Sequence, residues 1–347
     1  MPSPVECLEH ARHLLAERSV TEALCSFGEA ERAGADADAC AAGRWECAML
    51  LGQYEAAWQA SDEIGVREQA TGSQRFWDGT PLAGKRVMLR CLNGFGDALQ
   101  FIRYAPKIRG QAASLCVEAH PEIVSLLRAC AGVEHAITWG QHAPAEPPPW
   151  DAQIEIMELP RIFRATSATV PVVFPYLDPK CLPGTPSTTV LIRTMQGRRR
   201  EGRLQVGVAW RSSNWNPLRS LPLPSLATAL ETLEHCDFYS LQEDGARELA
   251  HISNPNISNV ETVFTDLALR ISQLDLVLTI DGVLAHLAGA LGIPVLLLLP
   301  YAADWRWGLE ARTPWYPRAT LFRQQSPGDW SYPVHGAVTA LRHLTGA

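Results

Sequence analysis

Two loops of this chain combine glycine with a carboxylate directly after a strand-like run of apolar residues. The first is NGFGD (93–97), which follows KRVMLRCL, and the second is Asp281-Gly282, which follows DLVLTI. Parallel sheets bind ligands at the carboxyl ends of their strands, where glycine lets a ligand approach the backbone and the next helix offers free N–H groups. The two loops predict one ligand held between them across a cleft.

Asp97 ends the first loop and is expected at the start of the helix that follows. An aspartate at that position can cap the helix through its carboxylate, which would satisfy the side chain without any chemistry. The spacing of Gly94 and Gly96 also differs from the dinucleotide-binding G-x-G-x-x-G fingerprint. The alternatives for Asp97 are therefore a helix cap and a functional carboxylate in the cleft.

The second loop has the features of a nucleotide pocket. Asp281 is expected at a strand end, Gly282 leaves room for a phosphate or a ribose, and the following helix supplies its dipole and N–H donors. His286 falls on the first turns of that helix. The alternative for His286 is a buried, hydrogen-bonded histidine beside the sheet.

A third polar loop, RSSNWNPLRS (211–220), follows the strand-like run LQVGVAW. It offers charge-assisted donors for a diphosphate, although solvated loop arginines are the alternative. The candidate donor-binding residues of this loop are Arg211, Ser212, Asn214 and Arg219. Gln242 ends the next strand-like run, DFYSLQ, and is expected on the same edge of the sheet.

The segment Asp304-Trp305-Arg306-Trp307 follows the strand-like run Val295–Leu299. Its aromatic rings could stack on a base or a sugar, or they could cover the core of the domain. Val295–Leu299 is apolar at every position, which predicts a central strand covered on both faces and the last strand of its sheet.

Strand-like and helical runs alternate from Gly84 onward, which predicts parallel sheets and an α/β fold. A stretch rich in Pro, Thr and Arg interrupts the alternation and predicts a linker over 179–203. The alternation thus predicts two Rossmann-like domains, over 78–178 and 204–330, and we expect a final helix over 331–347.

Residues 1–70 form a helical, alanine-rich segment that contains a repeat. Ala23 aligns with Ala57 at a spacing of 34 residues, and Leu51-Gly52-x-Tyr54 leads into the second copy. This pattern resembles the tetratricopeptide repeat. Because a free solenoid of this kind needs about three units, we expect the segment to pack on the rest of the protein.

Composition excludes several classes of function. The 347 residues carry a formal charge of −7 and include no basic stripe that would bind a phosphate backbone. A nucleic acid partner is therefore not predicted. No apolar run reaches the ~20 residues of a membrane span, and the opening MPSPVECLEH lacks a signal core, which predicts a cytoplasmic protein. The nine cysteines include no C-x-x-C pair, so neither a metal site nor a disulfide framework is predicted.

The blocks described above resemble, in order and spacing, bacterial tetratricopeptide-repeat proteins whose C-terminal part is similar to glycosyltransferase family nine, the ADP-heptose:lipopolysaccharide heptosyltransferases. The similar blocks are WDGTPLAGKRVML (77–89), NGFGDALQFIRYAP (93–106), VGVAWRSSN with LRSLPL (206–223), YSLQ (239–242), DGVLAHLAGALG (281–292) and DWRWGLEARTPWYP through FRQQSPGDW (304–330). The resemblance implies a GT-B fold of two facing Rossmann-like domains. It also implies a nucleotide-sugar donor on the C-terminal domain and inversion at the anomeric carbon without a metal.

The resemblance also implies roles for single residues. Asp97 matches the acidic residue that acts as general base on the acceptor hydroxyl, and Arg211 stands where heptosyltransferases often have a lysine near the diphosphate. Gln242 replaces a glutamate, which puts specificity for heptose in doubt because an amide and a carboxylate read hydroxyls differently. The other donor-binding matches are Arg219, Asp281, Gly282 and His286. The candidate contacts of the acceptor or the sugar are Asn93, Gly94, Gly96, Gln100, Trp305 and Arg306.

The sequence therefore predicts an inverting, metal-independent glycosyltransferase with no cofactor beyond its nucleotide-sugar donor. Its acceptor would be a glycan or a protein hydroxyl, and the helical repeats could engage a protein partner. Relatives with a cysteine-ligated iron finger match less well because the cysteine cluster is missing. The alternatives are a non-catalytic nucleotide-sugar-binding scaffold that recruits a partner through its repeats, and a sugar-nucleotide epimerase.

Overall fold

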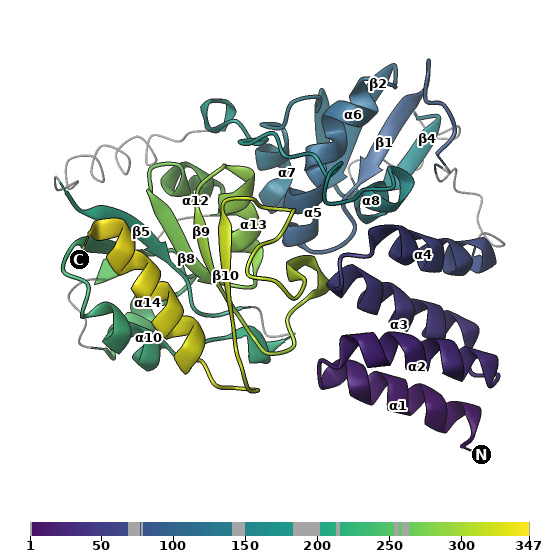
Figure 1. The fold of residues 1–347 in the computed structure, drawn as a ribbon. Helices are drawn as coiled ribbons and strands as arrows, with labels where there is room; N and C mark the ends of the chain where they lie inside the picture. Colours follow the sequence, from purple (N-terminus) through teal and green to yellow (C-terminus); the bar gives the residue numbers. More distant parts are fainter. Residues whose placement is uncertain are drawn as a thin grey trace.

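The computed structural model describes residues 2–68, 77, 79–140, 150–182, 202–212, 216–252, 257–258 and 264–346. In chain order these residues form a helical segment, a four-stranded sheet domain and a six-stranded sheet domain (Figure 1). This arrangement confirms the predicted α/β class with a helical segment in front of it.

The helical segment consists of two helix pairs. Ala23 and Ala57 are fully buried on the second helix of each pair, as the repeat predicts, and Phe27 is buried in the same core as Ala23. The assignment of this helical segment as a tetratricopeptide repeat stays a prediction. The helices are α1 (Pro4–Ala16), α2 (Val20–Arg32), α3 (Ala37–Leu50) and α4 (Tyr54–Glu68).

The first sheet domain has its strands in the order β3-β2-β1-β4, all parallel. The chain reverses its direction of winding between β1 and β4, and such a switch point leaves a crevice at the carboxyl ends of the two strands. Its strands are β1 (Arg86–Arg90), β2 (Ser114–Ala119), β3 (His135–Thr138) and β4 (Ala152–Glu155). Its helices are α5 (Phe95–Phe101), η1 (Ile102–Tyr104), α6 (Ala105–Arg109), α7 (Pro121–Leu127), η2 (Ile156–Glu158) and α8 (Leu159–Ile162), and η3 (Pro179–Cys181) follows.

The second sheet domain has the order β10-β9-β8-β5-β6-β7, again parallel throughout the described pairs. Its switch point lies between β5 and β8. The strands are β5 (Leu204–Val208), β6 (Cys236–Ser240), β7 (Ile257–Ser258), β8 (Leu276–Ile280), β9 (Val295–Leu299) and β10 (Ala319–Arg323). The helices are η4 (Pro217–Arg219), α10 (Leu223–Leu230), α11 (Gly245–Leu249), α12 (Phe264–Ile271), α13 (Val283–Ala290), η5 (Trp305–Trp307) and α14 (Ser331–Thr345).

Strand β9 is buried at all five positions, and it pairs with β8 on one side and β10 on the other. Its central place is as predicted, but the prediction that it is the last strand is wrong. The run ATLFR of β10 escaped notice because it is short and lies at the edge of the sheet, and it is neither apolar throughout nor strictly alternating.

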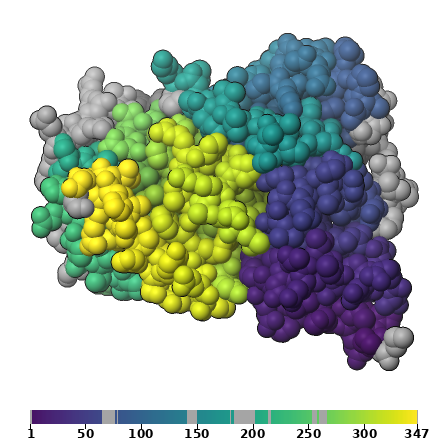
Figure 2. Space-filling view, in the orientation of Figure 1, coloured from purple at the N-terminus to yellow at the C-terminus, as the bar shows by residue number. Residues whose placement is uncertain are grey.

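The helical segment packs on both sheet domains (Figure 2). Trp45 of α3 contacts Trp305 with ring centroids 5.2 Å apart. Trp58 of α4 donates from its indole nitrogen to the carbonyl of Ala165 at 2.8 Å in the first sheet domain. The segment therefore spans the two domains from one side, which is the packing that two repeat units require.

Three further predictions concern the linker, a membrane span and the cysteines. Most of the predicted linker (179–203) lies outside the described residues, which resume at Gly202. Within the described ranges, no helix is both long enough and apolar enough to cross a membrane. All nine cysteines are described, and each is a free thiol.

Two glycines of the helical segment give a matched test of its packing. A Cβ on Gly43 would lie 2.3 Å from the Phe27 ring, whereas a Cβ on Gly28 would meet nothing within 4 Å. We expect Gly43→Ala to lower the free energy of unfolding by about 1–3 kcal/mol. Gly28→Ala should raise it by up to about 1 kcal/mol, because alanine is the better helix former. Urea unfolding measures both, and equal effects would contradict the α2–α3 packing.

Candidate active site

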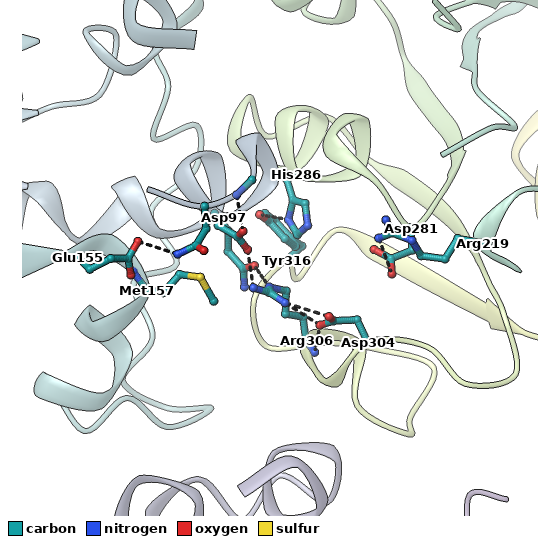
Figure 3. A network of polar contacts seen from close by, with 12 residues as sticks. Asp97, Glu155, Met157, Arg219, Asp281, His286, Asp304, Arg306 and Tyr316 are labelled. Carbon is teal, nitrogen blue, oxygen red and sulfur yellow. Dashed lines mark hydrogen bonds and ion pairs between the residues drawn. The ribbon is translucent and has the colours of Figure 1, made fainter. Parts of the chain in front are cut away.

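A cleft of about 510 Å³ lies between the two sheet domains, within the size range of small-molecule sites. Its first-domain wall is the turn after β1, and its second-domain wall comes from the segments after β5, β6, β8 and β9. Both switch points of the fold thus open into one space. Figure 3 shows the polar contacts around it, among them the pair of Asp97 and Arg306 that joins the two domains.

Asp97 belongs to the first-domain wall. Helix α5 begins at Phe95, two residues earlier than predicted, so Asp97 lies on its first turn instead of at its start. One carboxylate oxygen accepts from the backbone N–H of Gly94 at 3.0 Å, and the other accepts from the guanidinium of Arg306 at 2.5 Å. The side chain keeps 21% exposure. Asp97 therefore caps the helix and also faces the cleft.

Arg306 connects the two domains. Its Nε donates to the amide oxygen of Gln100 at 2.9 Å, and its Nη1 donates to Asp304 at 2.9 Å. The guanidinium also lies over the Trp305 ring, 4.5 Å from its centroid. Burial by itself would lower the pKa of Arg306, but the carboxylates of Asp304 and Asp97 outweigh it and raise the pKa. Arg306 is therefore a permanent charge that fixes the position of Asp97.

His286 lies on the opposite wall against the glycine loop. Its ring stacks on Trp307 at 5.3 Å, and its Nδ1 lies 2.9 Å from the hydroxyl of Tyr316. A Cβ on Gly96 would come within 2.7 Å of the ring, so the first-domain backbone touches it directly. Burial holds the pKa of His286 well below its usual range, and the charges of Arg306 and Arg103 add to the effect. The ring is neutral at physiological pH.

Asp281 follows β8 and sits almost fully buried beside Arg219, whose Nη1 is 3.5 Å from its Oδ2. Burial raises the pKa of Asp281, the negative charge of Asp304 adds to this, and Arg219 opposes it. Gly282 is the N-cap residue of α13, and it has no side chain that could bond to the first N–H groups of the helix. The turn from Asp281 to Leu284 lines the cleft, so the first N–H groups of α13 lie at its wall.

Arg211 lines the cleft after β5 and is held from two sides. Its Nε donates to Glu248 at 2.8 Å, and its Nη2 donates to the carbonyl of Glu243 at 3.0 Å. The amide oxygen of Gln242 accepts from the backbone N–H groups of Trp210 and Arg211 at 3.2 and 2.8 Å. Gln242 therefore shapes the Arg211 turn, and a glutamate oxygen could accept the same two bonds.

Most of the predicted site residues meet in this cleft. Those that line it are Gly94, Gly96, Asp97, Arg211, Ser212, Arg219, Gln242, Asp281, Gly282, His286 and Arg306. Asn214 lies outside the described residues.

Three predicted contacts of the acceptor or sugar lie elsewhere. Gln100 is fully buried and holds Arg306 instead of facing a ligand. Asn93 donates to Glu155 at 3.1 Å. Trp305 packs between Trp45 and Trp315 at 5.2 and 6.0 Å, so its ring joins the helical segment to the second domain. Each of the three thus connects elements of the fold next to the cleft instead of lining it.

Two supporting residues were missed by the sequence analysis. Glu155 ends β4, next to the Asn93 turn, and burial raises its pKa. Tyr316 holds His286 by its hydroxyl. The carboxylate of Glu155 within the run DAQIEIM (151–157) could have been noticed, since it falls at the same sheet edge as Asp97. No local pattern marks Tyr316.

Known structures share this fold, whereas no protein-family model matches the chain. The glycosyl transferase family 9 structure from Veillonella parvula DSM 2008 has a TM-score of 0.54 at 10% sequence identity, covering 77% of this chain and 98% of that chain. The ADP-heptose lps heptosyltransferase II of E. coli has a TM-score of 0.55 at 15% identity, covering 76% of this chain and 100% of that chain. The GT-B fold that the sequence resemblance implied is thereby confirmed.

A curated relative is also similar in sequence. Protein FlbA of Caulobacter vibrioides is 24% identical over 338 residues, which cover 86% of this chain and 54% of FlbA. The chain thus spans about half the length of this relative.

The contact between Gly96 and His286 tests how closely the domains approach. Gly96→Ala should lower the free energy of unfolding by about 1–3 kcal/mol, because His286 is packed between two rings and cannot yield freely. Gly282→Ala is the matched control, since its Cβ meets nothing within 4 Å. It should stay within about 0.5 kcal/mol of wild type. Equal stability of the two variants in urea unfolding would mean that the domains stand apart in solution.

The neutral state of His286 predicts a pH dependence. The unfolded histidine binds a proton below its ordinary pKa near 6.5 and the folded one does not, so its burial costs stability as pH falls. Relative to His286→Gln, wild type should lose about 1.4 kcal/mol of unfolding free energy between about pH 7.5 and 5.5. Denaturant unfolding at both pH values measures this difference. A difference that does not change with pH would show that His286 titrates normally.

Proposed function

We propose that this protein is an inverting, metal-independent glycosyltransferase that moves a sugar from a nucleotide-diphosphate sugar to a hydroxyl of a glycan or protein acceptor. One observation carries the proposal. A carboxylate of the first domain, Asp97, and an arginine-rich pocket of the second domain, around Arg219 and Asp281, line the same cleft.

The reaction assigns a role to each wall. Asp97 takes the proton of the acceptor hydroxyl while its oxygen attacks the anomeric carbon, and the bond from that carbon to the diphosphate breaks with its electron pair. The diphosphate departs with an added negative charge, which Arg219, Arg211 and the N–H groups at the start of α13 stabilise. A single attack from the face opposite the leaving group inverts the anomeric carbon.

Fixed cations support a mechanism without a metal. Arg219 and Arg211 line the cleft, and Arg211 is held in place by Glu248. Guanidinium groups of this kind can take the charge of a leaving diphosphate.

The nine free thiols favour a reducing compartment such as the cytoplasm.

One of the solved structures with this fold is, by its name, an ADP-heptose lps heptosyltransferase. An ADP-linked sugar is therefore the first donor to test. The amide oxygen of Gln242 accepts from the backbone of the Arg211 turn, and a glutamate oxygen could do the same. The residue type at this position therefore does not distinguish heptose from another sugar.

The donor can be found by thermal-shift screening against ADP-, GDP-, UDP- and dTDP-sugars. A donor present at 100 times its dissociation constant adds ~2.7 kcal/mol to the free energy of unfolding, which gives a clear shift. A protein that binds a sugar nucleotide but neither hydrolyses nor transfers it would favour the non-catalytic scaffold.

Replacing the base tests the role assignment. Asp97→Asn should lower the rate of transfer by about 10²–10⁴-fold, because the amide cannot take the proton. Affinity for the nucleoside diphosphate, measured by calorimetry, should stay within about twofold because Arg219 and α13 are untouched. Glu122→Gln is the control, since Glu122 is an exposed carboxylate on the first turn of α7 in the same domain. Loss of both nucleotide binding and transfer in Asp97→Asn, with the fold intact, would contradict the assignment.

A further inference from the structure

A second cavity of about 320 Å³ lies between the helical segment and the second sheet domain. We call this cavity the annex. Arg219, Asp281 and Asp304 line both the annex and the main cleft, so the two spaces meet at these side chains. The helical segment forms its other wall through Arg12, Leu15, Ala16, Arg18 and Glu46.

The annex wall is attached firmly. Arg18 follows α1 and donates to the carbonyls of Tyr301, at 3.2 Å, and Ala303. Tyr301 returns a hydrogen bond from its hydroxyl to the carbonyl of Glu17 at 2.9 Å. Arg18 adopts a φ of +64°, an uncommon conformation for a residue with a side chain, and these bonds hold it there. The end of α1 is therefore a fixed part of the wall.

The polar groups of the annex are mixed in sign. Three carboxylates, from Glu46, Asp281 and Asp304, stand with three guanidinium groups, from Arg12, Arg18 and Arg219. A phosphate would meet the carboxylates and a basic peptide would meet the arginines, so neither is matched. Sugar hydroxyls both donate and accept, and they can bond to both kinds of group.

Glu46 has the clearest capacity to bind. It is partly buried on α3, and no described residue forms a hydrogen bond or an ion pair with its carboxylate within the usual distances. Burial raises the pKa of Glu46, with Arg18 opposing and the negative charge of Asp304 adding to the increase. A hydroxyl donor from a ligand could replace solvent at this carboxylate, which accepts hydrogen bonds through both of its oxygens.

We propose that the annex is a sugar subsite, in which the helical segment binds hydroxyl groups of the substrate that occupies the main cleft. The inference rests on the proposed function. The hydroxyls belong either to the far end of the transferred sugar or to a sugar of the acceptor, and the chemistry of recognition is the same for both. The helical segment is then part of the substrate site.

Filling the annex tests the proposal. Ala16 is exposed at the end of α1 and lines the annex, so Ala16→Trp inserts an indole without removing a polar contact. It should lower kcat/KM for transfer at least tenfold while affinity for the nucleoside diphosphate alone stays within twofold. Ala56→Trp, at an exposed alanine of α4 outside the annex, is the matched control and should leave kcat/KM unchanged. Glu46→Gln preserves shape and should cost severalfold in the same assay.

The effects of Ala16→Trp on binding and hydrolysis distinguish a transferred sugar in the annex from an acceptor sugar there. If the annex holds the transferred sugar, Ala16→Trp weakens binding of the sugar nucleotide but not of its nucleoside diphosphate, and donor hydrolysis falls. If the annex holds an acceptor sugar, donor binding and hydrolysis are unchanged and the KM for the acceptor rises. Either pattern supports the annex. If kcat/KM for transfer stays within twofold of wild type in both Ala16→Trp and Glu46→Gln, the annex proposal is overturned and the proposed function is not. If the wild-type protein binds none of the sugar nucleotides, the proposed function is overturned as well.

Discussion

The ion pair between Arg306 and Asp97 is the contact on which the site depends. Arg306 is 9% exposed, and a buried cation without partners would cost several kcal/mol. Its partners come from both domains, Asp97 and Gln100 from the first and Asp304 from the second. Separating the domains would remove Asp97 and Gln100 from Arg306, so the pairing of this buried cation holds the Asp97 carboxylate against the pocket around Arg219 and Asp281.

A second buried arginine fixes the same interface from behind. Arg103 donates to the carbonyl of Trp315 at 2.6 Å and to the hydroxyl of Tyr176 at 3.0 Å, and its guanidinium lies 4.7 Å from the ring centroid of Tyr316. Tyr316 in turn holds His286. Cation–π contacts of desolvated arginines contribute about 2 kcal/mol or more, so this cluster restrains the tilt between the domains. Together the two arginines define the width of the cleft.

The sequence predicted the fold and the cleft-lining turns because both follow from local patterns. A strand ending in glycine and a carboxylate places Asp97 and Asp281 at sheet edges, and parallel strands bring such edges to a switch point. The roles of Gln100 and Trp305 could not be predicted, since they depend on partners about two hundred and about two hundred and sixty residues away in the chain. Strand β10 was missed because it is a short edge strand without a regular pattern. The annex was missed because it exists only where the helical segment meets the second domain.

A crystal structure with a bound sugar nucleotide tests the central claim most directly. The account predicts that the diphosphate lies within hydrogen-bonding distance of Arg219 and the first N–H groups of α13, with the anomeric carbon facing Asp97 across the cleft. A nucleotide bound on another surface, or an anomeric carbon turned away from Asp97 with the domains in this same arrangement, would contradict it.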